Sequence, residues 1–233
     1  VTAENVAKKS GVSREEQDEF ALESQRRAAT PEAQAAFAEE ITPFEVGGRK
    51  PFTADKDEHP KPDTTLETLA GLRPAFAKDG SVTAGNASGI NDGAASVVLG
   101  RESAVAERGL TGLVSLEAVT TAAMEPELMG YAPTHALRAL FDKTGTSPSD
   151  IGSIELNEAF ASQAVAVIRD TELDPARVNP YGGAIALGHP VGATGAILTL
   201  RLAKDMVRRD LELGIVTMCI GGGQALAAMF RRI

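Results

Sequence analysis

Two glycine-rich stretches near the end of the chain dominate its sequence. Residues 179–195 read Asn-Pro-Tyr-Gly-Gly-Ala-Ile-Ala-Leu-Gly-His-Pro-Val-Gly-Ala-Thr-Gly, and residues 214–223 read Gly-Ile-Val-Thr-Met-Cys-Ile-Gly-Gly-Gly. The first contains His189, one of only three histidines, and the second contains Cys219, the only cysteine. Glycines permit tight turns and the close approach of a ligand, and successive glycines can direct their N–H groups towards one anion. The two stretches therefore predict a site where an imidazole and a thiol act beside a backbone anion-binding turn.

Other functions of glycine-rich sequence fit these stretches less well. A lone cysteine is most often a small buried hydrophobic residue, and one cysteine with three scattered histidines gives no usual metal-ligand spacing, so we expect no metal site. The gap from Gly183 to Gly188 matches a phosphate-binding loop, but His189-Pro190 stands where that loop has Lys followed by Ser or Thr. The glycines of residues 188–195 also miss the dinucleotide-binding spacing.

Composition limits the class of protein. The 233 residues, 43% hydrophobic and 24% charged, suffice for one or two domains with a packed core. A net charge of −9 argues against a nucleic-acid groove. The sequence has no apolar run of membrane-spanning length and no signal-peptide pattern at its start. A single cysteine excludes an internal disulfide and fits a reducing compartment, so we expect a cytoplasmic protein that binds neither membrane nor nucleic acid.

Capping signals and hydrophobic periodicity predict a mixed α/β fold. Thr2, Ser13 and Thr30 stand where N-caps are expected, ahead of three successive helices over residues 2–39. Further helices are predicted over 65–72, 102–108, 133–145, 158–170 and 191–209, and strands over 41–46, two pieces of 82–99, 112–122, 153–156, 215–220 and 225–230. Polar loops are expected over 47–63 and 124–132. From residue 113 onward the order β-α-β-α-α-β-β indicates a layered α/β unit around a buried sheet.

Three blocks resemble the signature motifs of one enzyme family in both order and spacing. They are Asn157-Glu-Ala-Phe-Ala161, Gly182-Gly-Ala-Ile-Ala-Leu-Gly-His-Pro-Val-Gly-Ala-Thr-Gly195 and Cys219-Ile-Gly-Gly-Gly223. These blocks are similar to those of thiolases, the acetyl-CoA acetyltransferases and 3-ketoacyl-CoA thiolases. The resemblance runs the length of the chain, but it covers only the later part of a thiolase.

The resemblance implies a thiolase-like α/β fold. Residues 1–80 would be part of the loop domain that covers coenzyme A. Residues 81–110 would hold the last strands of the N-terminal half, and residues 111–233 would form the complete C-terminal domain. Coenzyme A and acyl-CoA would be substrates, with no other cofactor, and the full-length protein would be a homodimer or homotetramer.

The family motifs also assign catalytic roles. The resemblance implies that His189 activates the nucleophile and lines a first oxyanion site with a water held by Asn157. Cys219 would be the second acid/base, since a thiol of unperturbed pKa about 8.5 suits a proton shuttle near neutral pH. The N–H of Gly221 would serve a second oxyanion site. Without the resemblance, a helix cap is an adequate role for Asn157.

Five further residues are expected to contact coenzyme A or the acyl group: Lys61, Ser88, Met129, Ala159 and Phe160. Lys61 matches a basic residue, often Arg, that contacts the coenzyme A phosphates, Ser88 would face the pantetheine arm, and Met129 would border the acyl pocket. Lys61, Ser88 and Met129 also have a purely structural interpretation, because a loop lysine is usually solvated, a serine stabilises turns, and a methionine fills gaps in packing.

The sequence also departs from the family. Thiolases carry the cysteine that becomes acylated in an early motif, upstream of the equivalent of Val1, so this chain as it stands cannot form the acyl-enzyme. We therefore expect a fragment of an acyl-CoA C-acyltransferase, which performs thiolysis of 3-ketoacyl-CoA or Claisen condensation. Ala132 and Ala225 stand where the family commonly has glycine.

Two alternatives remain open. One is a non-catalytic thiolase-like protein that binds acyl-CoA or a partner. The other is a ketoacyl-synthase-like condensing enzyme, a group that typically has a second histidine where Cys219 stands.

Overall fold

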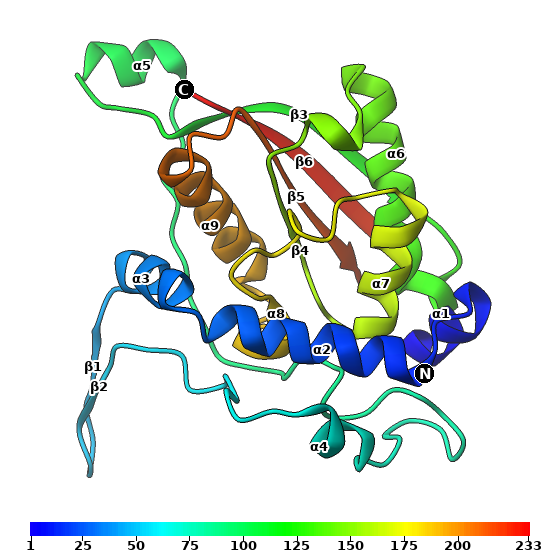
Figure 1. Cartoon of the computed structure of the whole chain (residues 1–233). Helices are drawn as coiled ribbons and strands as arrows, with labels where there is room; N and C mark the ends of the chain where they lie inside the picture. The colour runs from blue at the N-terminus through cyan, green and yellow to red at the C-terminus, as the bar shows by residue number, and fades with distance from the viewer.

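A four-stranded sheet of order β3-β6-β5-β4 forms the centre of the computed structural model, which describes all 233 residues (Figure 1). Strands β3 (Val114–Ala123), β6 (Gln224–Arg232) and β5 (Leu213–Ile220) are successively antiparallel, and β4 (Ser153–Leu156) runs parallel to β5. The predicted order of strands and helices after residue 113 is confirmed. None of the helices combines the length and apolarity that crossing a membrane requires.

Helices cover both faces of this sheet. Helices α6 (Ala132–Thr144) and α7 (Ala161–Asp170) lie on one face and α9 (Thr194–Arg208) on the other (Figure 1). Alternation along β5 explains the two layers, since Ile215 joins the 18-residue core cluster under α6 and α7 while Val216 packs with α9. Full burial of each such side chain stabilises the fold by about 1.5–3 kcal/mol.

Three N-terminal helices, α1 (Thr2–Ser10), α2 (Arg14–Ala28) and α3 (Pro31–Glu40), wrap around this layered unit. The predicted capping box is present, with Ser13 accepting from the N–H of Glu16 and the Glu16 side chain accepting from the N–H of Ser13. Thr30 caps α3 as predicted. The prediction of Thr2 as a cap was wrong, because Thr2 already lies inside α1 and Val1 occupies the capping position without a side-chain bond.

The middle of the chain has little regular structure. It contains a hairpin of β1 (Phe44–Val46) and β2 (Phe52–Ala54), which projects from the body in Figure 1, and two short helices, α4 (Leu66–Ala70) and α5 (Glu102–Glu107). Strand β2 lies inside the region predicted as a loop over 47–63. Its partner β1 supplies the hydrogen bonds that a single-strand pattern does not reveal.

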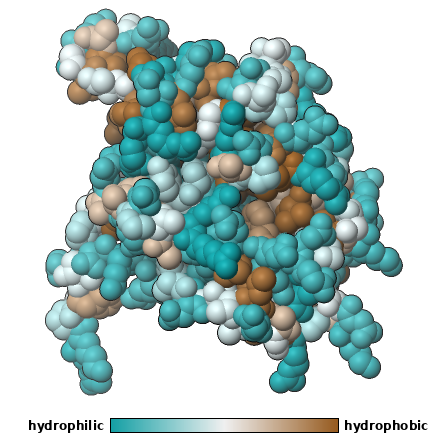
Figure 2. Space-filling model, viewed as in Figure 1, coloured by the Kyte–Doolittle hydropathy of each residue, from teal (hydrophilic) through white to brown (hydrophobic).

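The two strands predicted within 82–99 were wrong, because the structure has no strand over these residues. The assignment of residues 81–110 to the N-terminal half stays a prediction. A strand needs a neighbour to pair with, and this segment makes only two isolated bridges, Ala87 with Phe160 and Ile90 with His189. The side chains of Val98 and Leu99 are 95% and 87% exposed. Figure 2 shows hydrophobic surface at the upper end of the molecule, around α5 and the C-terminus.

Short helical turns complete the structure. The region predicted as a loop over 124–132 is mostly the 3-10 helix η1 (Pro126–Tyr131), and η2 (Pro148–Asp150), α8 (Ala184–Leu187) and η3 (Gly221–Gly223) are single turns. Helix α7 begins three residues later than predicted, with Phe160 at its N-cap. Asn157 is therefore not a helix cap, and its side chain is available for another role.

Candidate active site

Asn157 and His189 meet at the carboxyl edge of the sheet. Asn157 follows β4, and its N–H donates to the carbonyl of Thr217 on β5 at 3.0 Å. Its side-chain Nδ2 lies 3.3 Å from Nε2 of His189, which follows the turn after α8. The carboxyl edge of parallel strands is where α/β proteins place ligands.

The His189 imidazole is held on both sides. Its Nδ1 lies 2.7 Å from Oγ1 of Thr194, and its backbone N–H donates to Oδ1 of Asn91 at 3.1 Å. Burial lowers the pKa of His189 below its ordinary value of 6.5. The ring is thus neutral at pH 7 and has one nitrogen free to accept a proton.

Gly188 makes the turn before His189 possible. Its φ is 92°, which side chains rarely adopt, and a Cβ there would lie 2.4 Å from Oδ1 of Asn91. The loop at Ile90 and Asn91 therefore packs directly against the backbone that carries the imidazole.

Cys219 lies near the end of β5, two residues beyond Thr217, whose carbonyl binds Asn157. The register puts its side chain opposite Ala225, on the face of the sheet that η1 and α6 cover. Cys219 is 7% exposed, and burial raises the pKa of its thiol to about 11. The resting thiol is therefore protonated, and no hydrogen bond joins it to His189.

The triple glycine after β5 forms a tight turn. Gly222 and Gly223 have φ of 78° and 88°, and a Cβ on Gly223 would lie 2.2 Å from the carbonyl oxygen of Met124. Gly221 is exposed, and a Cβ there would meet nothing within 4 Å. The turn requires glycine at position 223, where a side chain would clash. At Gly221 the turn is open, so a ligand can approach its backbone.

Three of the residues expected to bind substrate come together. The N–H of Ser88 donates to the carbonyl of Ala159 at 3.0 Å, and Ala87 forms an isolated antiparallel bridge with Phe160. The Phe160 ring also packs edge-on against Phe76, with centroids 6.1 Å apart. Residues 86–88 thus lie against the segment that follows Asn157.

Lys61 and Met129 make no hydrogen bonds to the three side chains expected to act in catalysis. Lys61 is exposed, and its backbone N–H donates to Oε1 of Gln25 at 2.8 Å. Met129 is half-buried in η1, which contacts both β5 and η3. The structure brings neither residue into a hydrogen bond with His189, Asn157 or Cys219.

Comparisons with known proteins identify the family. Residues 1–103 match the thiolase N-terminal domain family, and residues 110–232 match the thiolase C-terminal domain family. The chain belongs to the thiolase family. An acetyl-CoA acetyltransferase of Pseudomonas aeruginosa is 49% identical over 234 residues, which are 100% of this chain and 60% of that protein.

Solved thiolase structures confirm the predicted fold. The acetyl-CoA acetyltransferase of Bacillus anthracis matches with a TM-score of 0.97 at 44% identity, and human mitochondrial 3-ketoacyl-CoA thiolase matches with 0.91 at 39%. Each match covers 100% of this chain and 59% of the solved chain. The chain therefore has a thiolase-like α/β fold throughout, and it spans about 60% of the length of the curated relatives it matches.

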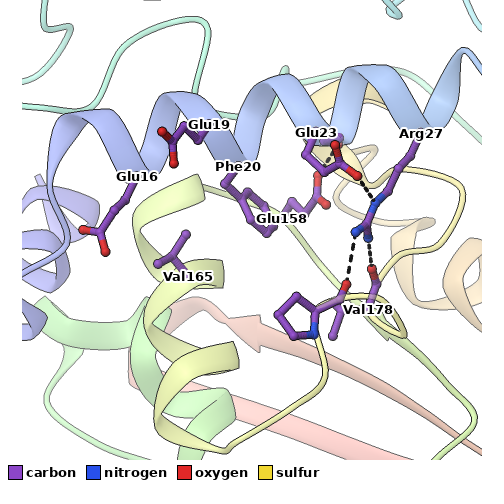
Figure 3. Close-up of a pocket in the computed structure, with 10 residues that line it drawn as sticks. Glu16, Glu19, Phe20, Glu23, Arg27, Glu158, Val165 and Val178 are labelled. Carbon is purple, nitrogen blue, oxygen red and sulfur yellow. Dashed lines mark hydrogen bonds and ion pairs between the residues drawn. The ribbon is translucent and has the colours of Figure 1, made fainter. Parts of the chain in front are cut away.

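Two cavities of this thiolase chain are separate from the candidate site formed by Asn157, His189, Cys219 and Gly221. One of about 300 Å³ lies beneath α2, where Figure 3 shows acidic side chains of that helix and Arg27 above Glu158 and Val178. Glu158 is buried and accepts from Ser24 and Asn179, and burial raises the pKa of its carboxyl. The other cavity, of about 320 Å³, lies between α2, α3 and the loop of residues 56–62. Neither is lined by His189 or Cys219, and no cluster of three His, Cys, Asp or Glu side chains could hold a metal ion.

Two residues that touch His189 were not predicted as site residues. Thr194 stands in the block Gly-Ala-Thr-Gly195, so its place in a signature motif was a usable signal. Asn91 lies outside the three motif blocks, and nothing in its local sequence indicates a bond to a residue 98 positions away.

Proposed function

We propose that the full-length protein is an acyl-CoA C-acyltransferase of the thiolase type. It cleaves 3-ketoacyl-CoA with coenzyme A, or it runs the reverse Claisen condensation of two acyl-CoA molecules. The observation that carries this proposal is the pairing of Asn157 with His189 at 3.3 Å, on the sheet edge where the Cys219 strand also ends. Relatives of this chain carry the names acetyl-CoA acetyltransferase and beta-ketothiolase.

The proposed reaction divides the chemistry between these residues. His189 takes the proton of a nucleophilic thiol, and the thiolate attacks the 3-keto carbon, whose oxyanion the Gly221 N–H stabilises. The bond between the α-carbon and the keto carbon then breaks. The leaving enolate, whose oxygen is stabilised by the imidazole and a water held by Asn157, takes a proton at its α-carbon from the Cys219 thiol and departs as acetyl-CoA, while the shortened acyl group stays on the nucleophilic sulfur. The Cys219 thiolate next takes the proton of incoming coenzyme A, whose sulfur attacks the acyl-enzyme carbonyl while the same Gly221 N–H stabilises the oxyanion. The enzyme thiolate then leaves and takes back its proton from His189, and the shortened acyl-CoA is released.

The high pKa of Cys219 fits this assignment. A thiol of pKa about 11 is a poor resting nucleophile at pH 7, because almost none of it is thiolate. It can, however, protonate a carbanion, which is far more basic. Since Cys219 is the only cysteine in the chain, we propose that the acylated cysteine belongs to polypeptide outside these residues.

The remaining predictions concern binding and assembly. Lys61 binds the coenzyme A phosphates, Ser88 with Ala159 and Phe160 lies along the pantetheine arm, and Met129 borders the acyl pocket. The contact of Ser88 with Ala159 supports treating these residues as one binding surface. A homodimer or homotetramer in the cytoplasm stays a prediction.

Thiolysis of acetoacetyl-CoA by the full-length protein tests the proposal. Cys219→Ala removes the acid/base and should lower kcat by about 10²–10⁴-fold, the usual contribution of such a group. Cys219→Ser tests how much of the loss a poorer acid restores, and thermal unfolding of each variant checks that it folds. Wild-type activity in Cys219→Ala would rule out the acid/base role. Binding of coenzyme A without any turnover by the wild type would favour the non-catalytic alternative.

A further inference from the structure

The hydroxyl of Thr194 stands between a carbonyl oxygen and an imidazole nitrogen at the start of α9. Its Oγ1 lies 2.9 Å from the carbonyl oxygen of Pro190 and 2.7 Å from Nδ1 of His189. Thr194 is 3% exposed, so water does not compete freely for these bonds. The Pro190 carbonyl is held in place by the backbone N–H groups of Ala193 and Thr194, at 2.8 and 2.9 Å.

Counting protons assigns the direction of each bond. A hydroxyl carries one proton, and a carbonyl oxygen can only accept, so the Thr194 proton goes to Pro190. The 2.7 Å contact then requires that Nδ1 of His189 carries the ring proton and donates it to Oγ1. A neutral imidazole has one N–H, so Nε2 is left with the free lone pair, facing Nδ2 of Asn157.

The opposite tautomer fits the same contacts less well. If Thr194 donated to Nδ1, two oxygens would face each other at 2.9 Å with no proton between them.

We propose that Thr194 is a positioning residue that fixes the tautomer and the orientation of His189, so that Nε2 is the nitrogen that exchanges protons. The catalytic consequence rests on the proposed thiolase function, whereas the tautomer itself does not. Thr194 touches no reacting atom in this scheme and acts only through the imidazole. Its hydroxyl has the role that a carboxylate or backbone carbonyl has behind other catalytic histidines.

Nitrogen NMR of the full-length protein labelled with ¹⁵N-histidine tests the tautomer directly. The His189 signals are assigned by their loss in His189→Gln and are read at a pH where the ring is neutral. We expect the shift of a protonated nitrogen at Nδ1 and of an unprotonated one at Nε2. Thr194→Val, which replaces the hydroxyl by a methyl group, should give a mixture of tautomers, and Thr194→Ser should keep the wild-type pattern. A proton on Nε2 in the wild type, or an unchanged tautomer in Thr194→Val, would overturn the proposal.

Kinetics separates this inference from the proposed function. In thiolysis, Thr194→Val should lower kcat by roughly 10- to 100-fold with KM for acetoacetyl-CoA nearly unchanged, and Thr194→Ser should restore most of the loss. This is smaller than the ~10⁴-fold loss when a serine-protease histidine is forced into the wrong tautomer, because a neutral hydroxyl orients the ring more weakly. A wild type without thiolysis but with the expected Nδ1 proton would overturn the thiolase function and support the tautomer. An active wild type whose Thr194→Val variant keeps full kcat would overturn the positioning role. Should Thr194→Val fail to fold, the wild-type spectrum still decides the tautomer.

Discussion

Residues 114–232 and residues 41–109 are built in opposite ways. In the first region four strands pair in one sheet over a core cluster of 18 buried residues. The second has a two-stranded hairpin and two short helices, and its Ile90, Val98 and Leu99 are 95%, 95% and 87% exposed. One region is a rigid frame and the other a surface segment held by a few specific bonds.

The candidate site draws on both regions for different tasks. The frame supplies the residues proposed for chemistry, namely Asn157, His189, Cys219 and Gly221, whereas the surface segment supplies Lys61 and Ser88 for binding. They meet where Oδ1 of Asn91 accepts the N–H of His189. We therefore expect substitutions in the frame to change stability or kcat strongly, and substitutions in the segment to change binding alone.

The largest effect is expected at Glu155, inside the frame. This side chain is fully buried, and neither of its oxygens has a hydrogen-bond partner. Burial raises its pKa from 4.5 to about 8, against the attraction of Arg201. Between these two values the unfolded chain has lost the proton and the folded chain retains it. The contribution of Glu155 to stability should therefore be fully present below pH 4.5, fall by at most about 1.4 kcal/mol per pH unit towards pH 8, and level off above.

Glu155→Gln should remove the Glu155 contribution to that slope, because an amide does not titrate, whereas the carboxyls of Glu40, Asp57 and Glu158, whose pKa values desolvation also raises, keep theirs. Urea unfolding at several pH values between 5 and 8.5 measures it, and Glu19→Gln, at an exposed position of α2, is the matched control. Any constant energetic cost of burying the amide lowers the free energy of unfolding equally at every pH and does not change its slope against pH. The same pH slope in Glu155→Gln and wild type would show that the buried carboxyl is charged in the folded protein.

The next effect is expected at Gly221, where the frame opens to the ligand. Ile220 is extended, with φ −126° and ψ 156°, and Gly221 is the first residue of η3, so proline fits this position. Gly221→Pro removes the N–H and adds a ring, and Gly221→Ala keeps the N–H and adds a Cβ that meets nothing within 4 Å. If the N–H stabilises an oxyanion, proline should lower the kcat of thiolysis by about 10²–10³-fold. Alanine should cost far less, and equal rates in both variants would exclude the oxyanion role.

The contrast between local and long-range signals also explains which parts of the fold could be predicted from the sequence. The caps of α2 and α3 and the apolar run of β5 are local signals, so these elements were predicted from residues within a few positions. The strands expected within 82–99 failed because a strand depends on a partner, and the local pattern of Val97 and Val98 does not say whether one is present. Local sequence also predicted the short helices α4 and α5 of the segment, but it did not predict which of its residues pair as strands.

For the candidate site, residue types were predictable but contacts were not. Asn157 and His189 were found through their motifs, 32 positions apart, and the fold brings them together. The bonds of Thr194 and Asn91 to His189 depend on the path of the backbone through Gly188 and Pro190. No spacing rule encodes that path, so both contacts emerge only in three dimensions.

The smallest effect is expected at Lys61, in the surface segment. Its backbone is fixed independently of its side chain, since the N–H donates to Gln25 and the carbonyl accepts from the N–H of Thr64 at 3.1 Å. Lys61→Ala should thus leave unfolding unchanged. If the ammonium binds a coenzyme A phosphate, KM for coenzyme A should rise about 5-fold with kcat constant, which corresponds to the roughly 1 kcal/mol of an exposed ion pair.

Two controls test whether the loss of coenzyme A affinity is specific to Lys61: the dependence on ionic strength and the same substitution at another exposed lysine. The effect of Lys61→Ala should shrink as ionic strength rises, because screening weakens exposed charge pairs. Lys61→Arg should keep or improve the affinity, since the guanidinium can bind phosphate through two N–H groups. Lys50→Ala, at an exposed lysine in the turn between β1 and β2, should leave KM unchanged. If Lys50→Ala and Lys61→Ala raised KM equally, the segment would act only through its overall charge, and the division between a catalytic frame and a residue-specific binding segment would not hold.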